Sequence, residues 1–110
     1  MYQTNALLFV KKRDNRIVPF DENKIVQAIN KALREVRDES LEISQNLADL
    51  VVEALNKKFK KGEIPTVEQI QDVVIKILKE NKFEDVATCY QDYRERRAKI
   101  REAKYWLLYK

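Results

Sequence analysis

Histidine is absent from this chain of 110 residues, and cysteine and glycine each occur once, as Cys89 and Gly62. Without histidine and with one thiol, a single chain cannot build a His/Cys zinc site, a disulfide framework or a histidine-based triad. A P-loop or a Rossmann fingerprint needs several glycines to bring backbone close to phosphate, so a single glycine excludes both. We therefore expect none of these sites, and we interpret Cys89 as a small buried hydrophobic residue.

Long apolar runs are missing as well. No segment approaches the roughly 20 apolar residues that a membrane-spanning helix needs. The N-terminus lacks the basic segment followed by an apolar run that is typical of a signal peptide. The sequence therefore favours a soluble protein located in the cytoplasm.

Charged residues are abundant, at 36% of the chain, beside 45% hydrophobic residues. A chain of this length and composition suits one domain with a buried core. Its 22 Lys and Arg against 18 Asp and Glu give a net charge of +4, spread along the whole sequence. This moderate basic bias permits phosphate ligands or nucleic acid without demanding either.

The most informative stretch begins as a short hairpin and runs into a helix. Apolar residues flank a connection at Asp14-Asn15, where asparagine tolerates the positive φ of a two-residue type I′ turn. Asp21 is expected to cap the helix that follows, by accepting from its first backbone N–H groups. Lys12 and Lys24 then converge where a strand ends and a helix begins, which suits a polyanion such as a triphosphate.

Helical spacing of apolar residues predicts four helices in the rest of the chain. They are expected at about 22–37, 41–61 and 66–80, and from residue 85 onward. Thr66 and Gln69 form a capping box, and Ile64-Pro65 can add a short third strand beside the hairpin. The expected fold is α+β, with a small N-terminal hairpin sheet of two to three strands covering a four-helix bundle. We expect residues 1–110 to form one domain, with a core at about 7–101 and a helical tail at 102–110.

The stretch from Val10 to Ile25 has the pattern Val-x-Lys-Arg-Asp-x-Arg-x-Val-x-Phe-Asp-x-x-Lys-Ile. It resembles the opening signature of the ATP-cone, a nucleotide-sensing regulatory domain of many ribonucleotide reductases and of their nucleotide-responsive transcriptional repressor. The resemblance continues at residues 64–72 and 93–97, so it covers roughly residues 7 to 101. Asn15 stands where the family usually has glycine, but asparagine can adopt the same backbone conformation.

The resemblance implies an allosteric function, with no catalysis and no metal site built from protein ligands. An ATP-cone binds ATP or dATP, and its occupancy changes how subunits associate and thereby controls reductase activity. Magnesium would enter with the nucleotide phosphates and not through a protein cage. The expected partners are the nucleotide and either a reductase catalytic chain or a second copy, with no membrane partner.

The resemblance also assigns apolar residues to the nucleotide. Val10 and Ile25 resemble the family's adenine-pocket wall, and Val18 and Phe20 resemble its hairpin lining. Each of these four side chains could equally belong to an ordinary hydrophobic core.

The resemblance also assigns polar residues of this stretch to the base and to the phosphates of the nucleotide. Asp21 resembles the family's base-reading group, and Lys12 and Lys24 resemble its phosphate cations. Arg13 joins them as a candidate. Without the resemblance, the cations beside the turn would be interpreted as a solvated charge cluster.

Later in the chain, Gln71 resembles a residue that points toward the sugar or the phosphates, although alone it could be a surface glutamine. Thr66 has a sufficient role as a cap, so a nucleotide contact would be additional. At least one of Arg94, Arg96 and Arg97 is expected to close over the triphosphate, the alternative being a solvated helix face with local ion pairs. Arg97 is expected to point inward, because it shares a helical line with two tyrosines.

Two other functions remain open. One is the sensor part of the transcriptional repressor, which in that family follows a zinc ribbon whose ligands are missing here. The other is a basic helical protein that binds nucleic acid, which we favour less. The tail from Tyr105 to Lys110 holds three aromatics in six residues. We expect it to fold back on the core, and the alternative is an interface for a second copy or for the rest of a larger protein.

Overall fold

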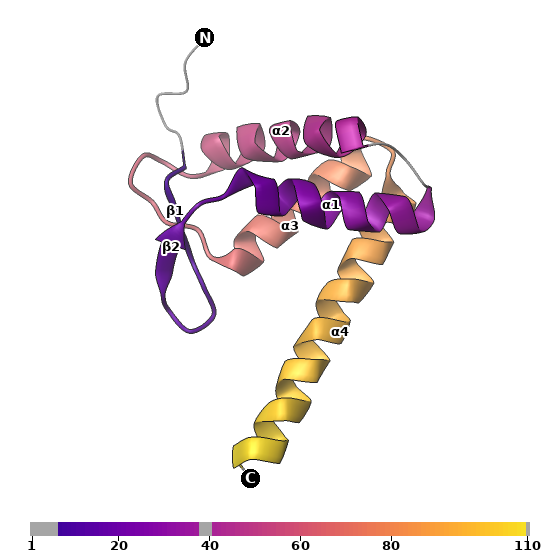
Figure 1. Cartoon of the computed structure of the whole chain (residues 1–110). Helices are drawn as coiled ribbons and strands as arrows, with labels where there is room; N and C mark the ends of the chain where they lie inside the picture. Colours follow the sequence, from indigo (N-terminus) through magenta and orange to yellow (C-terminus); the bar gives the residue numbers. More distant parts are fainter. Residues whose placement is uncertain (1–6, 38–40, 110) are drawn as a thin grey trace.

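A two-stranded hairpin precedes four helices in the computed structural model, which describes residues 7–37 and 41–109 (Figure 1). This arrangement confirms the expected α+β class. The elements are β1 (Phe9–Lys11), β2 (Ile17–Pro19), α1 (Glu22–Val36), α2 (Leu41–Lys58), α3 (Val67–Glu80) and α4 (Glu84–Tyr109).

The hairpin is closed by residues 13–15, which connect the hydrogen-bonded pair Lys12 and Arg16. Strands β1 and β2 pair antiparallel, with Val10 opposite Val18. The Lys12 N–H donates to the Arg16 carbonyl at 2.8 Å, and the Asn15 N–H donates to the Lys12 carbonyl at 2.9 Å. Within this connection only Asn15 has a positive φ, of 69°. A type I′ turn would need positive φ at two residues, so that turn type was wrong, whereas the positive φ of Asn15 is confirmed.

The segment before α3 docks on β1 without forming a strand. The Lys11 N–H donates to the Pro65 carbonyl at 2.9 Å, and a single parallel bridge joins Lys11 to Thr66. Proline has no N–H with which to extend a ladder. In the part of the chain that the structure describes, the expected third strand is therefore reduced to this bridge, which sets the start of α3 beside the hairpin.

Capping groups fix where the helices begin. The Asp21 carboxylate accepts from the Asn23 N–H at 3.0 Å, and α1 starts at the next residue after the cap. The Thr66 hydroxyl accepts from the Gln69 N–H while the Gln69 side chain accepts from the Thr66 N–H. Both predicted caps are thus confirmed. Helix α2 ends at Lys58, three residues before its expected end.

The core lies where α1 packs on α2 and α4, and where α3 packs on α2 and α4. Burial removes apolar side chains from water and is the main favourable contribution to folding. The large, almost completely buried aliphatic side chains are Ile29, Leu33, Val51, Leu55, Val74, Leu78 and Val86. Val86 represents α4 in this group and lies in the first turn of that helix. The core therefore holds only the beginning of α4.

Helix α4 leaves the other helices and projects away from them (Figure 1). Every side chain from Glu95 to Leu108 is exposed, and those of Leu107 and Leu108 are 85% and 73% exposed. The expectation that the tail folds back on the core was therefore wrong. Helix α4 continues in one direction, and none of the described side chains in its last turns is buried.

In the two described ranges, no helix combines the length and the apolar character needed to cross a bilayer.

Candidate functional site

A pocket of about 210 Å³ lies between the hairpin, the start of α1 and the first turns of α3. Eight residues proposed from the sequence line it together. They are Val10, Lys12, Val18, Phe20, Asp21, Lys24, Ile25 and Gln71. The remaining lining residues are Pro19, Ala28, Val67, Ile70 and Tyr90.

The pocket has an apolar floor and a polar rim because of how the hairpin meets α1. Val10 and Val18 are paired across the strands, and Ile25 lies one turn into α1 and is buried. Lys12 follows Val10 by two residues, so extended backbone places both side chains on one face. Lys24 sits one turn into α1 and is exposed. A flat apolar ring would fit the floor, and an anion would fit the rim.

Gln71 stands at the inner end of this pocket, one turn into α3. Its side-chain oxygen Oε1 is buried and has no hydrogen-bond partner among the described residues. Buried polar atoms are almost always paired, so this acceptor needs a donor that the described residues do not supply. Tyr90 lies nearby, and burial raises the pKa of its hydroxyl to about 12. The neutral hydroxyl therefore remains a hydrogen-bond donor at physiological pH.

A second pocket, of about 240 Å³, shares the walls Ala28, Gln71 and Tyr90 with the first. We call it the arginine pocket, because its other lining residues are Arg13, Tyr93, Arg94, Arg97 and Arg101. Arg13, Arg94 and Arg97 were candidates from the sequence. Arg101 was missed, although its spacing of four residues after Arg97 places it on the same helical face.

Two of these arginines are held by carboxylates of α3. Arg13 Nε lies 2.7 Å from Glu68 Oε2. Arg94 donates to Asp72 Oδ1 at 2.8 Å. These ion pairs tie the turn of the hairpin and the middle of α4 to the same helix, and so they hold the arginine pocket in shape.

Arg97 does not point inward as expected. Its side chain is exposed, and its guanidinium carbon lies 5.9 Å from the centre of the Tyr93 ring. The half-buried arginine of this helix is instead Arg94. Two further candidates, Thr66 and Arg96, line neither pocket.

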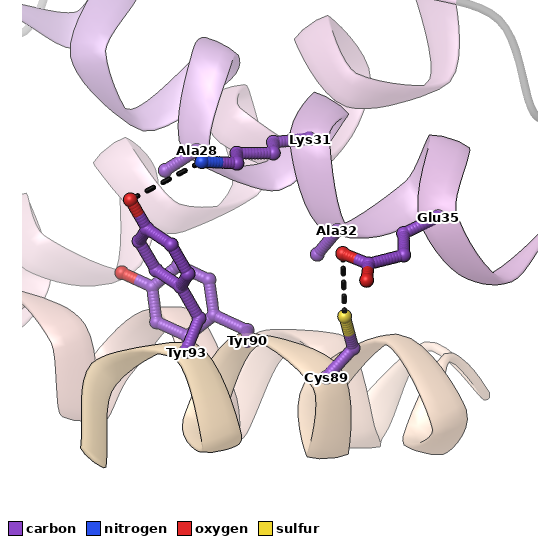
Figure 2. Close-up of a pocket in the computed structure, with 7 residues that line it drawn as sticks. All are labelled: Ala28, Lys31, Ala32, Glu35, Cys89, Tyr90 and Tyr93. Atoms are coloured by element: carbon purple, nitrogen blue, oxygen red, sulfur yellow. Dashed lines mark hydrogen bonds between the residues drawn. The ribbon is translucent and has the colours of Figure 1, made fainter. Parts of the chain in front are cut away.

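A third, smaller cavity of about 40 Å³ lies between α1 and α4 and borders the arginine pocket at Ala28, Tyr90 and Tyr93 (Figure 2). Lys31 reaches across it and donates to the Tyr93 hydroxyl at 3.2 Å. This hydrogen bond and the positive charge of Lys31 lower the pKa of Tyr93.

Cys89 lines the other end of the same cavity (Figure 2). It is half-buried, and its sulfur lies 3.6 Å from Glu35 Oε2. Partial burial and the neighbouring carboxylate raise the pKa of the thiol. The expected burial is only partial, because the side chain packs at the edge of the core beside a carboxylate. The raised pKa disfavours the reactive thiolate.

No group of three or more His, Cys, Asp or Glu side chains able to hold a metal ion occurs within residues 7–37 and 41–109. The site as described is thus an apolar pocket joined to a cationic one.

Comparison with known proteins identifies the family. Residues 8–99 match the family model of the ATP cone domain. The chain belongs to the ATP cone domain family. This membership supports a regulatory role that depends on nucleotide binding.

Several relatives of this ATP cone domain are ribonucleotide reductases. The vitamin B12-dependent ribonucleoside-diphosphate reductase of Thermoplasma acidophilum is 46% identical over 100 residues, which cover 86% of this chain and 12% of the reductase. The enzyme of the same name from Mycobacterium tuberculosis is 40% identical over 95 residues, covering 86% of this chain and 13% of the reductase. The ribonucleoside-diphosphate reductase subunit alpha of Chlamydia muridarum is 39% identical over 102 residues, which cover 84% of this chain and 10% of that subunit. The chain thus spans only about a tenth of the length of these relatives.

Proposed function

We propose that this ATP cone domain binds ATP or dATP in the cytoplasm and controls the activity of a ribonucleotide reductase through subunit association. The observation that carries this proposal is the junction of an apolar pocket with the arginine pocket. An adenine nucleotide has the matching structure, with an apolar ring at one end and a polyanion at the other. The family and the reductase relatives support the same conclusion.

The base fits the apolar floor formed by Val10, Val18 and Ile25. The Asp21 carboxylate at the rim can accept a hydrogen bond from an exocyclic amino group. In this proposal a sugar hydroxyl donates to Gln71 Oε1, which lacks a partner in the described structure. Lys12 and the arginine pocket then bind the phosphates in this proposal.

Magnesium would reach this site with the phosphates. Mg²⁺ is commonly bound by one or two carboxylates plus phosphate oxygens, and it keeps several waters. The carboxylates nearest the arginine pocket, Glu68 and Asp72, are already paired with arginines. The nucleotide therefore supplies the oxygen ligands in this proposal.

The lysines of the rim provide the direct test. Lys12→Ala and Lys24→Ala should each weaken ATP binding by about 1.5–3 kcal/mol, the range for losing a hydrogen bond to a charged group. Isothermal titration calorimetry with ATP and with dATP measures affinity, stoichiometry and preference together. Lys11→Ala is the matched control, because Lys11 neighbours Lys12 but does not line the pocket.

Unchanged ATP affinity in both lysine variants, with normal circular dichroism, would show that the phosphate site is misplaced. A parent chain that binds DNA in a salt-dependent manner but does not bind ATP would contradict the nucleotide function itself.

A further inference from the structure

The arginine pocket extends farther along α4 than the family match does. Arg94, Arg97 and Arg101 follow one another at spacings of three and four residues, which places them on one face of the helix. Arg101 lies beyond residues 8–99, the range that matches the family model. It nevertheless lines the same pocket as Arg13 on the hairpin turn.

The positive charges in this pocket are only half compensated. Arg13 and Arg94 each have a carboxylate partner on α3. Arg97 and Arg101 form no salt bridge to a carboxylate within the described residues. Slight desolvation and the positive charges of Arg13 and Arg97 lower the pKa of Arg101, and the Glu68 carboxylate partly offsets this effect. An anion entering here would relieve this repulsion.

Position along the helix separates the two ends of the pocket. Tyr90 belongs to the wall shared with the apolar pocket, and Arg101 lies eleven residues later, or about 16 Å along the axis. Side chains of a helix tilt toward its N-terminus, so Arg101 leans back toward the pocket. A nucleotide anchored by its base therefore brings its last phosphate nearest to this residue.

We propose that Arg101 is a specificity-determining residue that makes this domain prefer nucleoside triphosphates over nucleoside monophosphates. The inference rests on the proposed function, because it needs the base to occupy the apolar pocket. A monophosphate anchored in that way ends near Lys12 and Gln71. Only the longer phosphate chain reaches Arg97 and Arg101, for which the described residues show no salt bridge.

The test compares AMP, ADP, ATP and inorganic tripolyphosphate by calorimetric titration into the full chain. Arg101→Gln should lower the affinity for ATP by about tenfold, as expected for losing one charge-assisted hydrogen bond. It should change the affinity for AMP by no more than about twofold. Arg101→Lys keeps the charge and should recover much of the ATP affinity. Arg96→Gln is the matched control, because Arg96 is on the same helix but outside the pocket, and it should change neither affinity by more than about twofold.

The outcomes separate this inference from the proposed function. ATP affinity that is unchanged in Arg101→Gln, or an equal loss for AMP and ATP, overturns the role of Arg101. If the parent binds ATP no more tightly than tripolyphosphate, the nucleotide function fails. A loss of tripolyphosphate binding in Arg101→Gln would in that case still support the anion-binding role of the arginine pocket.

Discussion

Gln71 has a buried side-chain oxygen without a hydrogen-bond partner among the described residues. A buried acceptor without a partner costs about 1–3 kcal/mol, and Gln71 Oε1 is such an atom in the described structure. A ligand hydroxyl that donates to it would recover that free energy. The sequence alone left Gln71 open between a surface side chain and a ligand contact, because helical spacing does not show what lies opposite a side chain.

Asn15 allows a direct test of the turn. Its φ of 69° is a conformation that glycine adopts without steric penalty and asparagine with little. We expect Asn15→Gly to be neutral or mildly stabilising. Asn15→Val should lower the free energy of unfolding by about 1–2 kcal/mol, because a β-branched residue is strained at positive φ. Thermal denaturation of the two variants measures both effects.

Ile17→Val is a suitable control for the Asn15 variants, since Ile17 is exposed in the neighbouring strand β2 and its backbone conformation suits either residue. If Asn15→Val melts at the same temperature as the parent, the positive φ at this position is wrong.

The arginines of α4 show that helical spacing does not predict which side chains are buried. Their spacing placed Arg97 on the face with the tyrosines and left the choice among Arg94, Arg96 and Arg97 open, and Arg94 and Arg97 line the arginine pocket. The inference that Arg97 is turned inward failed because it assumed a partner along this part of α4. Periodicity identifies a face, but it does not show whether another element covers that face.

Among the elements, α3 has the start that was easiest to predict. The Thr-x-x-Gln pattern is a local signal whose two hydrogen bonds form within four residues, and both are present. The third strand was harder to predict, because a strand needs a partner in register. Pro65 lacks an N–H and Thr66 already caps the helix, so only one bridge to β1 forms.

Removing the cap of α3 should destabilise the chain. Thr66→Ala leaves helix N–H groups without their side-chain acceptor and should lower the free energy of unfolding by about 1 kcal/mol. Urea denaturation followed by circular dichroism measures the change.

Thr88→Ala is the control for the same substitution inside a helix. The Thr88 hydroxyl donates to the Glu84 carbonyl within α4 and caps nothing, so its loss should be neutral or slightly stabilising. Equal losses of stability in both variants would show that the Thr66 hydroxyl has no special capping role.

At the scale of the whole molecule, the end of α4 is an exposed apolar surface. Tyr105, Trp106, Leu107 and Leu108 are more than half exposed. The rings of Tyr105 and Trp106 meet edge to face, with centres 6.1 Å apart. Contiguous apolar surface of this kind is typical of an interaction site. The proposed regulation requires such a surface, because occupancy must favour one association state over another.

We expect ATP or dATP to change the association state of this chain, and Trp106→Ala to weaken that change without abolishing nucleotide binding. Large aromatic side chains commonly contribute most of the free energy of an interface. Light scattering with and without saturating nucleotide measures the mass, and calorimetry checks that binding persists. Lys104→Ala, also exposed on the end of α4, is the matched control. A chain that is monomeric in every condition would contradict self-association through this tail.

The straight course of α4 also makes it a lever arm. The helix is held near its beginning by the core and by the Asp72–Arg94 ion pair, and beyond that point its side chains are exposed. From Tyr93 to Leu108 the axis extends about 22 Å, so a tilt of about 5° would move the tip by about 2 Å. Phosphates that draw Arg97 and Arg101 toward the hairpin would act at about 6 Å and 12 Å along this length. A small displacement at the arginines would thus be magnified at the aromatic end of the helix.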